Sequence, residues 1–289
     1  MNPGRLSIIG VGLLGGSIGL AIKSAAMPCR IVGYGHRRST LDKAVASGAI
    51  DEAAEGLAEA VKAADLVVLC TPVGLFRQTL AEIAPALAEG AIVTDVGSTK
   101  RSVVRAAAEL LPKHVNFVGS HPMAGSEKRG VDFARADLFV GSRCILTPDE
   151  STDRVALASV ESFWRALGMR TTTLSPGDHD RLVCAISHLP HALAASLVSM
   201  QDDGALPLAG KGFLDATRIA GGDGGLWRDI FLDNRDELAA SLTQFRRELD
   251  AFENLLQPAR ADDLAKWLDR AAARRAALLA EKLKEINPD

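Results

Sequence analysis

The chain has 289 residues, of which 47% are hydrophobic and 24% are charged, so it can bury one large core or two modest ones. A formal net charge of -3 and an isoelectric point near 6.1 provide no basic surface for nucleic acid, which makes a small molecule the expected partner. The cysteines form no C-x-x-C pair and fit reduced thiols in a cytoplasm; they are Cys29, Cys70, Cys144 and Cys184.

An apolar run near the N-terminus, LSIIGVGLLGGSIGLAI, follows Arg5 and is similar in part to a secretory signal peptide. Its five glycines disfavour a membrane-inserting helix, and a nucleotide-binding turn explains them better, although the signal peptide stays open as the alternative. No other segment approaches the ~20 uninterrupted apolar residues of a membrane span. We therefore expect a cytoplasmic protein that does not contact a membrane.

The first predicted strand, residues 6–9, runs into a G-x-G-x-x-G motif at the head of a helical pattern. Such glycines make a tight turn, admit a pyrophosphate to the backbone and let the helix pack on the strand, with the anion at the helix N-terminus. The motif is weak alone but strong between a strand and a helix, and glycines that serve packing only are the alternative. The expected cofactor-binding residues are Gly10, Gly12, Leu14 and Gly15.

The second predicted strand, residues 30–34, is followed by Gly35, where NAD-binding proteins carry an acid for the ribose 2′-hydroxyl. A guanidinium bonded to a 2′-phosphate instead is worth roughly 1.5 to 3 kcal/mol, or one to two decades of preference for NADP. The sequence therefore predicts NADP, with NAD possible, and a solvated basic turn as the alternative. The expected donors are His36, Arg37, Arg38, Ser39 and Thr40.

Further apolar runs alternate with helical patterns as far as residue 173, and they predict strands over residues 66–70, 92–95, 116–118, 144–147 and 171–174. Continuous apolar strands that alternate with helices indicate a doubly wound, mainly parallel sheet of the Rossmann type. After the SPGD stretch at residues 175–178, almost everything has helical spacing. We expect a nucleotide-binding domain over residues 1–173 and an all-helical domain over residues 174–289.

Ligands of an open α/β sheet gather at the carboxyl ends of its strands, and polar residues follow three of the predicted strands. Thr71 and Pro72 follow one strand, Ser98 the next and His121 the third. Ser98 is either the N-cap of a helix over residues 99–110 or a catalytic group, and the two uses are compatible. His121, expected on a loop, is a candidate general acid or base, although a lone histidine is usually structural.

The helical segment DHDRLVCAISHLPHALAASL separates Ser187 from His191 by four residues and His188 from His191 by three, so the three side chains share a face. Metal binding is the obvious rival for such a histidine pair. No third ligand with suitable spacing accompanies it, and we expect no metal.

Asp215 and Arg218 lie three residues apart, ahead of a glycine-rich loop and Trp227. Arg218 either clamps a carboxylate of the ligand with both arms of its guanidinium or pairs with Asp215.

The last helical pattern, residues 264–286, has one apolar face and one charged face, which is typical of a helix that packs against a partner subunit or a neighbouring domain.

Five stretches together make the chain similar to the prephenate and arogenate (cyclohexadienyl) dehydrogenases of tyrosine biosynthesis. They occur in the order and spacing of that family, between residues 6 and about 235: GVGLLGGSIG, TDVGSTK, GSHPMAGSEKRGV, SHLPHALA and TRIAGGDGGLWRDIF. The resemblance implies an oxidative decarboxylation in which hydride passes to NAD(P), the ring carboxylate leaves as CO2 and the ring becomes aromatic. It also implies a homodimer in which the helical domains intertwine.

The resemblance assigns roles residue by residue. His121 matches the histidine that draws the proton from the 4-hydroxyl of the substrate, and Ser98 matches the serine that orients this hydroxyl. Arg218 matches the arginine that holds a substrate carboxylate. The remaining expected substrate-binding residues are His191, Ser187, Trp227, Glu127 and Asp215.

Glu127 matches a position at which cyclohexadienyl relatives carry Glu and some prephenate-specific relatives carry His. A carboxylate there would accept the α-ammonium group of arogenate, so we expect arogenate to be used at least as well as prephenate; a surface salt bridge is the alternative. We expect the chain to lack the carboxy-terminal ACT regulatory domain of some relatives. The rival functions are a 3-hydroxyacid dehydrogenase or imine reductase, for which Lys211 is the nearest acid, and an NADP-sensing module.

Overall fold

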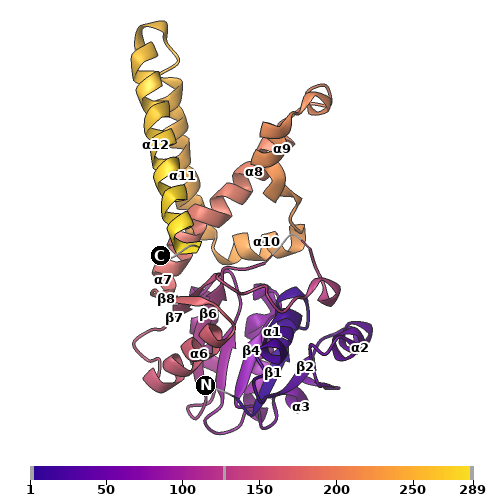
Figure 1. Cartoon of the computed structure of the whole chain (residues 1–289). Coiled ribbons are helices and arrows are strands. Elements are labelled where there is room, and N and C mark those ends of the chain that lie inside the picture. The colour runs from indigo at the N-terminus through magenta and orange to yellow at the C-terminus, as the bar shows by residue number, and fades with distance from the viewer. Residues whose placement is uncertain (1–2, 126–127, 287–289) are drawn as a thin grey trace. The chain divides into compact units, whose positions relative to one another are not determined.

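The structure is a computed structural model that describes residues 3–125 and 128–286 (Figure 1). Within these residues, eight strands form one sheet in the order β3-β2-β1-β4-β5-β6-β7-β8. All neighbours are parallel except β6 and β7. The strands are β1 (Arg5–Ile9), β2 (Arg30–Tyr34), β3 (Glu52–Ala53), β4 (Leu66–Leu69), β5 (Ile92–Asp95), β6 (Asn116–Pro122), β7 (Arg143–Thr147) and β8 (Arg170–Thr173).

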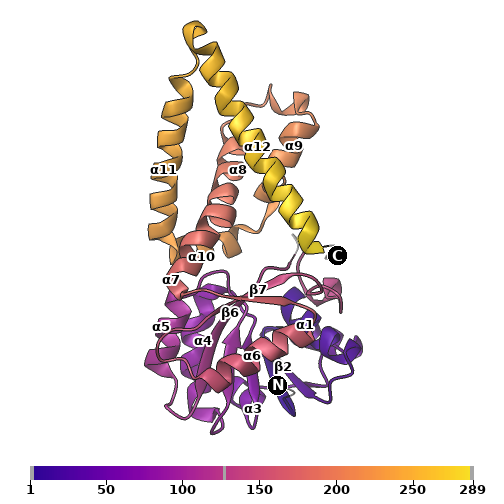
Figure 2. The same ribbon diagram turned by 60° about the vertical axis from the view of Figure 1, so that its left-hand side comes forward.

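Helices cover both faces of this sheet (Figures 1 and 2). One buried cluster joins the strands to α1 (Leu13–Ser24), α2 (Arg38–Ala46), α6 (Arg154–Ala166) and the short η3 (Val131–Phe133). The other joins them to α3 (Leu57–Val61), α4 (Phe76–Ile83) and α5 (Arg101–Leu110), with η1 (Val73–Leu75) and η2 (Ala84–Ala86) at the ends of α4. This three-layer arrangement confirms the predicted doubly wound, Rossmann-type fold.

The central strands β1, β4 and β5 are buried at successive positions because both of their faces are covered. In β1, the side chains of Leu6 and Ile8 enter one buried cluster and that of Ile9 enters the other. Successive side chains of a strand point to opposite faces, so a strand covered on both sides buries neighbouring residues alike, including the polar Ser7 between Leu6 and Ile8. Full burial of one such aliphatic side chain stabilises the fold by roughly 1.5 to 3 kcal/mol.

Two expectations about the sheet are wrong in detail. β6 does not end at Val118 but continues to Pro122, because its second half pairs with β7, in the antiparallel sense, from Gly119 opposite Thr147. His121 therefore lies inside a strand and not on a loop. The short strand β3 has no counterpart among the predicted strands, because two residues are too few for a hydrophobic pattern.

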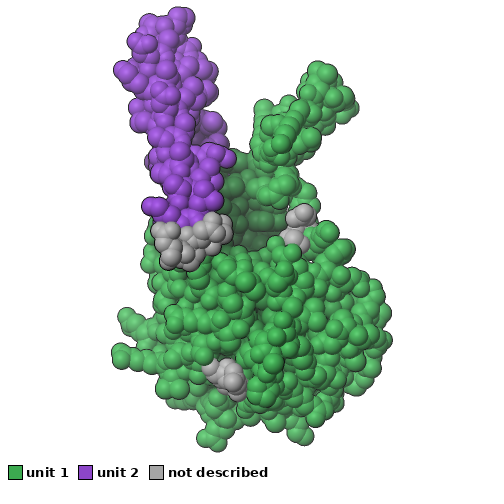
Figure 3. Space-filling model, viewed as in Figure 1, with its two compact units in different colours: residues 1–237 green, residues 238–289 purple. Residues whose placement is uncertain are grey.

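The part of the chain after β8 is helical, as predicted. It contains α7 (Pro176–Val183), the π-helical turn η4 (Cys184–His188), α8 (Leu189–Ser199), η5 (Leu206–Leu208), α9 (Lys211–Thr217), η6 (Arg218–Gly221), α10 (Gly224–Asp233), α11 (Arg235–Glu253), η7 (Pro258–Arg260) and α12 (Ala261–Ile286). The chain divides into two compact units, residues 1–237 and 238–289 (Figure 3). In the second unit, the rings of Phe252 and Trp267 join α11 to α12, with centroids 5.3 Å apart.

The continuous helical stretch Pro176–Ser199 is long and apolar enough to cross a membrane by length and composition alone. Its most apolar window has a mean hydropathy of 1.5, and 28% of that window is buried in the structure. The same stretch contains His179, His188 and His191, which are all buried. A helical stretch that buries three imidazole rings and exposes apolar side chains such as Ile186 and Leu197 fits a protein interface at least as well as a membrane.

Candidate functional site

A cleft of about 560 Å³ lies at the carboxyl ends of β1, β2 and β4. Such a position is where open α/β sheets bind nucleotides. Seven of the expected cofactor-binding residues line the cleft: Gly10, Gly12, His36, Arg37, Thr40, Thr71 and Pro72. Leu14, Gly15, Arg38 and Ser39 do not belong to its lining.

Different structural constraints favour glycine at the three glycine positions of the first turn. Gly10 has φ +101°, and a Cβ there would lie 2.8 Å from the carbonyl of Cys70. A Cβ on Gly15 would lie 2.3 Å from the carbonyl oxygen of Gly10, so close packing excludes any side chain. At Gly12, by contrast, a Cβ would meet nothing within 4 Å and would project at the wall of the cleft. Gly12 therefore leaves room for a ligand rather than for the protein.

The helix α1 offers a site for an anion at this turn. Gly12 is its N-cap, no side chain caps it, and its first turn, which includes Leu14, contains no acidic residue. The exposed N–H groups and the helix dipole attract a phosphate there. The hydroxyl of Thr71 is also buried at the cleft without a hydrogen-bond partner in the described part of the chain. These groups fit the pyrophosphate and ribose of a dinucleotide.

The turn after β2 separates its two arginines. Arg38 is held by Asp42, at 3.0 Å, and by Glu55, at 2.5 Å, and these contacts raise its pKa. Arg37 lines the cleft and makes no ion pair within the described residues. It is also the N-cap residue of α2, whose first turn has no acidic residue and no side-chain cap. The cationic group available to a ligand is therefore Arg37.

Ser98 does not cap the following helix, because α5 begins at Arg101 and not at Thr99. The cap comes from a distant residue instead. Asp180 of α7 accepts hydrogen bonds from the amide of Lys100, at 2.7 Å, and from the amide of Arg101, at 2.9 Å. The hydroxyl of Ser98, which is half-buried, has no hydrogen-bond partner in the part of the chain that the structure describes and is available for another use.

His121 is the centre of a buried polar chain. It is 8% exposed, and its Nδ1 lies 2.9 Å from Nε2 of His179. The Nδ1 of His179 lies 2.8 Å from the carboxylate of Asp180. His179 and Asp180 are 0% and 2% exposed. The contacts from the Asp180 carboxylate through His179 to His121 are therefore shielded from solvent. Sequence reasoning missed both residues.

A fully buried ion pair, Asp95 with Lys100, lies behind this chain. Lys100 also donates to the carbonyl oxygen of Ser120, at 2.9 Å, next to His121. Burial holds the pKa of His121 well below its ordinary value, and the neighbouring His179 and Lys100 lower it further. Burial also lowers the pKa of His179, although Asp180 opposes this. Both imidazoles are therefore neutral near pH 7, which is the form in which a histidine accepts a proton.

Two more buried histidines lie against Trp227. The ring of His191 stacks on Trp227 with centroids 3.5 Å apart, and His188 meets it edge-on at 6.2 Å. Burial lowers the pKa of His188 to about 4. Asn234 ties this cluster to the first one, since its side-chain amide contacts Nδ1 of His188 at 3.1 Å and donates to the carbonyl oxygen of Asp180 at 2.9 Å.

A π-helical turn over Cys184–His188 directly precedes α8, the helix that carries His191. A π turn inserts an extra residue into a helix and is frequent at functional sites. It brings His188 into full burial, while Ser187 stays half-buried beside it. The nitrogens His188 Nε2 and His191 Nδ1 are buried without partners in the described part of the chain, so both are able to bind a polar group of a ligand.

Arg218 is exposed and makes no ion pair among the described residues, so the alternative of a salt bridge with Asp215 is not seen. It begins η6, which packs against α8 and ends beside Gly222. A Cβ on Gly222 would lie 2.8 Å from the ring of His191 and 2.4 Å from that of Trp227. Asp215 is exposed on α9, and Glu127 lies outside the described residues.

The helix α10 connects these clusters to the sheet. Its Asp229 lies beside Gly74 of η1, and its Asp233 accepts a hydrogen bond from Ser102, at 2.6 Å. Its N-cap residue Asp223 forms an ion pair with Arg129, which lines the cofactor cleft. The helix that carries Trp227 thus contacts η1, the first turn of α5 and the loop that carries Arg129.

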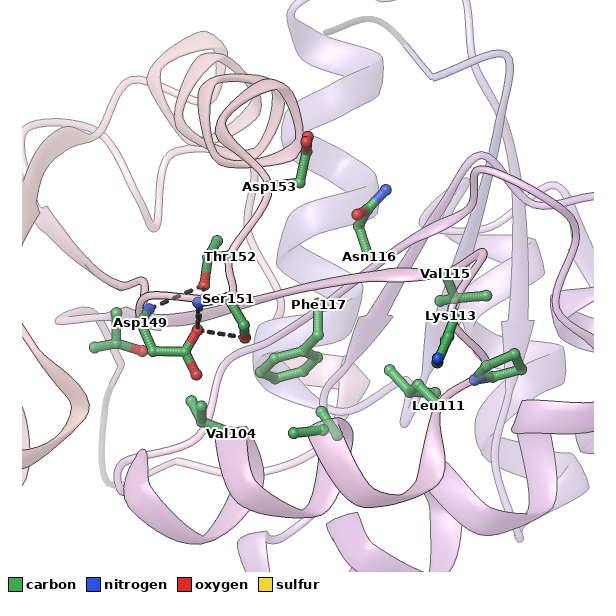
Figure 4. A pocket seen from close by; sticks show the side chains of 14 residues that line it. Val104, Leu111, Lys113, Val115, Asn116, Phe117, Asp149, Ser151, Thr152 and Asp153 are labelled. Carbon is green, nitrogen blue, oxygen red and sulfur yellow. Dashed lines mark hydrogen bonds between the residues drawn. The ribbon is translucent and has the colours of Figure 1, made fainter.

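A second cavity, of about 490 Å³, lies between α5 and the loop that follows β7 (Figure 4). None of the predicted site residues lines it. Asp149 accepts hydrogen bonds there from its own loop, from Ser151 and Thr152 (Figure 4), which is ordinary turn chemistry. Within the described residues, no group of three or more His, Cys, Asp or Glu side chains is arranged to hold a metal ion.

Comparison with known proteins shows two family models over most of the chain. Residues 18–173 match the prephenate dehydrogenase nucleotide-binding domain, and residues 175–270 match the prephenate dehydrogenase dimerization domain. The chain is 37% identical over 280 residues to a prephenate dehydrogenase of Bacillus subtilis, covering 94% of this chain and 76% of the relative. It is 34% identical over 281 residues to a cyclohexadienyl dehydrogenase of Zymomonas mobilis, covering 95% and 96%.

Solved structures agree with this result. A crystal structure of prephenate dehydrogenase from Aquifex aeolicus, in complex with hydroxyphenyl propionate and NAD+, superposes with a TM-score of 0.89 at 34% identity, covering 95% of this chain and 98% of the other. Arogenate dehydrogenase of Synechocystis superposes with a TM-score of 0.82 at 33% identity, covering 95% and 99%.

Proposed function

Because the chain belongs to the prephenate dehydrogenase family, we propose that it catalyses the oxidative decarboxylation of prephenate or arogenate with a nicotinamide cofactor. The observation that carries the proposal is a buried, neutral histidine, His121, on the carboxyl edge of a sheet that also forms a nucleotide-sized cleft. The products are 4-hydroxyphenylpyruvate or tyrosine, together with CO2.

Different residues of the chain bind the cofactor, accept the proton and bind the substrate. The α1 N-terminus, Gly12 and Thr71 hold the dinucleotide, which when bound supplies the hydride acceptor. His121 takes the proton of the 4-hydroxyl as its carbon becomes a carbonyl, and Ser98 orients that hydroxyl. Arg218 binds a carboxylate of the substrate with its free guanidinium. Loss of CO2 then makes the ring aromatic, which drives the reaction forward.

We propose further that NADP is preferred over NAD. Gly35 leaves space where an acid would repel a 2′-phosphate, and a Cβ there would have no contact closer than 3.7 Å. Arg37 and Thr40 line the cleft beside this space, and the uncapped N-terminus of α2 adds N–H groups for the phosphate. The A. aeolicus relative is bound to NAD+, so the proposed preference for NADP depends on this chain's own residues and not on that relative.

Arogenate is proposed as a substrate at least as good as prephenate. The two differ in the side chain, which carries an ammonium in arogenate and a keto group in prephenate, and Glu127 supplies a carboxylate for the ammonium. The relatives include both a prephenate and an arogenate dehydrogenase. His191, Ser187, Trp227 and Asp215 complete this end of the proposed pocket.

A cytoplasmic homodimer is the proposed form of the protein. The dimerization-domain model covers residues 175–270, where large apolar side chains are exposed: Ile186 is 69% exposed and Met200 75%. A second copy would cover these side chains. All four cysteines lie in described residues and are free thiols, as expected in a reducing compartment. No nucleic acid or membrane partner is proposed.

One assay tests the proposed function. Reduced nicotinamide is followed by absorbance while prephenate and arogenate are each offered with NADP and with NAD. We expect turnover with both substrates and higher kcat/KM with NADP. No turnover in any combination overturns the reaction. Prephenate efficiency tenfold above arogenate overturns the substrate proposal, and equal efficiency with both cofactors overturns the cofactor proposal.

A further inference from the structure

We propose that His179 and Asp180 are positioning residues that fix the tautomer of His121 and so decide which of its nitrogens faces the substrate. The inference rests on the proposed role of His121 as the base. It adds two residues of α7 that the sequence motifs do not single out. Their position is unusual, because they come from the helical part of the chain and act on a residue of β6.

The geometry requires one direction of hydrogen bonding. The carboxylate of Asp180 only accepts hydrogen bonds, so the Nδ1 of His179 carries the proton between them. In a neutral imidazole, the other nitrogen is then an acceptor, which makes His179 Nε2 the acceptor and His121 Nδ1 the donor. The proton of His121 is thereby assigned to Nδ1, and its Nε2 keeps a free lone pair.

This nitrogen is also the one that has no hydrogen-bond partner among the described residues. Within the described residues, Nε2 of His121 makes no hydrogen bond, whereas its Nδ1 is bonded to His179. The opposite tautomer would place N–H at the position where a base is needed and would direct two lone pairs at each other between the histidines. Only the tautomer that Asp180 selects is able to accept the proton of the substrate hydroxyl at Nε2.

Asp180 is itself held by several hydrogen bonds. Burial raises the pKa of this carboxyl, but hydrogen bonds from His179 and from the amides at the start of α5 outweigh burial and keep its pKa below the ordinary value. The same amides begin the helix that follows the Ser98 loop. One carboxylate therefore fixes both the tautomer of His121 and the end of the loop that carries Ser98.

The proton balance is simple. In the reaction, the bond between the substrate oxygen and its proton breaks, and the proton joins Nε2 of His121, which becomes an imidazolium. Its Nδ1–H stays bonded to His179, and the buried negative charge of Asp180 lies one imidazole away to stabilise the new positive charge. The hydride and its electron pair would pass to the nicotinamide of the proposed cofactor, which would be the only oxidant that the reaction needs.

The decisive comparison uses matched substitutions on α7. Asp180→Asn introduces an amide that is able to donate to His179 and reverse both tautomers; we expect kcat to fall at least 100-fold with KM for substrate changed less than about threefold. His179→Leu should give a similar loss. His179→Gln retains a hydrogen-bond acceptor for His121, so its kcat should be at least tenfold higher than that of His179→Leu. Asp178→Asn, an exposed position two residues earlier, should leave kcat within twofold of wild type.

The tautomers are read without any substrate by nitrogen-15 NMR of histidine-labelled protein, with His121→Asn to assign the signal. Wild type and Asp178→Asn should show His121 protonated at Nδ1, and Asp180→Asn should show it protonated at Nε2. If wild type shows the Nε2 tautomer, or if folded Asp180→Asn keeps both tautomer and kcat, the proposal is wrong. A protein without prephenate or arogenate turnover but with the expected tautomers would contradict the proposed function instead.

Discussion

Replacement of Arg37 by alanine separates the binding of NADP from that of NAD. Arg37 lines the cofactor cleft and is not engaged by a carboxylate among the described residues, whereas Arg38 next to it is held by Asp42 and Glu55. A hydrogen bond between charged groups is worth roughly 1.5 to 3 kcal/mol. Because Arg37 is exposed, solvent screening favours the lower figure. About 1.4 kcal/mol is a factor of ten, so the preference for NADP should fall about tenfold.

The assay is kcat/KM for each cofactor at saturating substrate, in wild type, Arg37→Ala and Arg38→Ala. We expect Arg37→Ala to lose efficiency with NADP and to keep its efficiency with NAD. Arg38→Ala is the matched control, since it removes the same charge from the same turn but from outside the cleft lining. An unchanged cofactor ratio in Arg37→Ala, or an equal change in Arg38→Ala, would refute the assignment of the 2′-phosphate to Arg37.

Three further predictions concern the substrate, the cofactor turn and the buried histidines. Arg218→Gln should raise KM for substrate about 10- to 100-fold with a smaller effect on kcat; a KM within twofold of wild type would contradict its role. Gly12→Ala should raise the cofactor KM at least tenfold with little change in Tm, whereas Gly56→Ala, also at an open helix N-cap, should leave the KM unchanged. The folded pKa of His188 is about 4, below its ordinary value of 6.5, so its contribution to stability is complete above pH 6.5 and is lost as pH falls toward 4. Urea unfolding should show that wild type loses about 2 kcal/mol more than His188→Gln between pH 7 and pH 5, and equal losses would contradict this.

The fold was predictable from the sequence because burial on two faces leaves a strong pattern. The run at β4 is apolar throughout and that at β2 after its first residue, while β1 and β5 contain the apolar pairs Ile8–Ile9 and Ile92–Val93. Glycine also marks the first turn, as a parallel unit requires. The extension of β6 to Pro122 was not predictable, because Ser120 and His121 are polar and their pairing with β7 joins segments that are far apart in the sequence. Local pattern does not report such distant pairing.

The site was predictable where one residue type alone performs a task, as at Gly10, with its positive φ. It was not predictable where tertiary structure assigns the task. Asp180 caps a helix whose first residue is 79 positions earlier, and nothing in the local sequence DHDRL distinguishes it from the exposed Asp178. The buried pair of Asp95 and Lys100 was missed for the same reason, since a charged side chain in sequence predicts a solvated surface.

The central claim is that His121 is the base of a nicotinamide-dependent oxidative decarboxylation. The most direct test follows the absorbance of reduced nicotinamide over time for wild type and His121→Asn, with prephenate and with arogenate. The Tm of both proteins is measured as a control for folding. We predict that the substitution lowers kcat by about 100-fold or more and leaves KM and Tm nearly unchanged. A wild-type protein without turnover, or a variant with undiminished kcat, would contradict the claim.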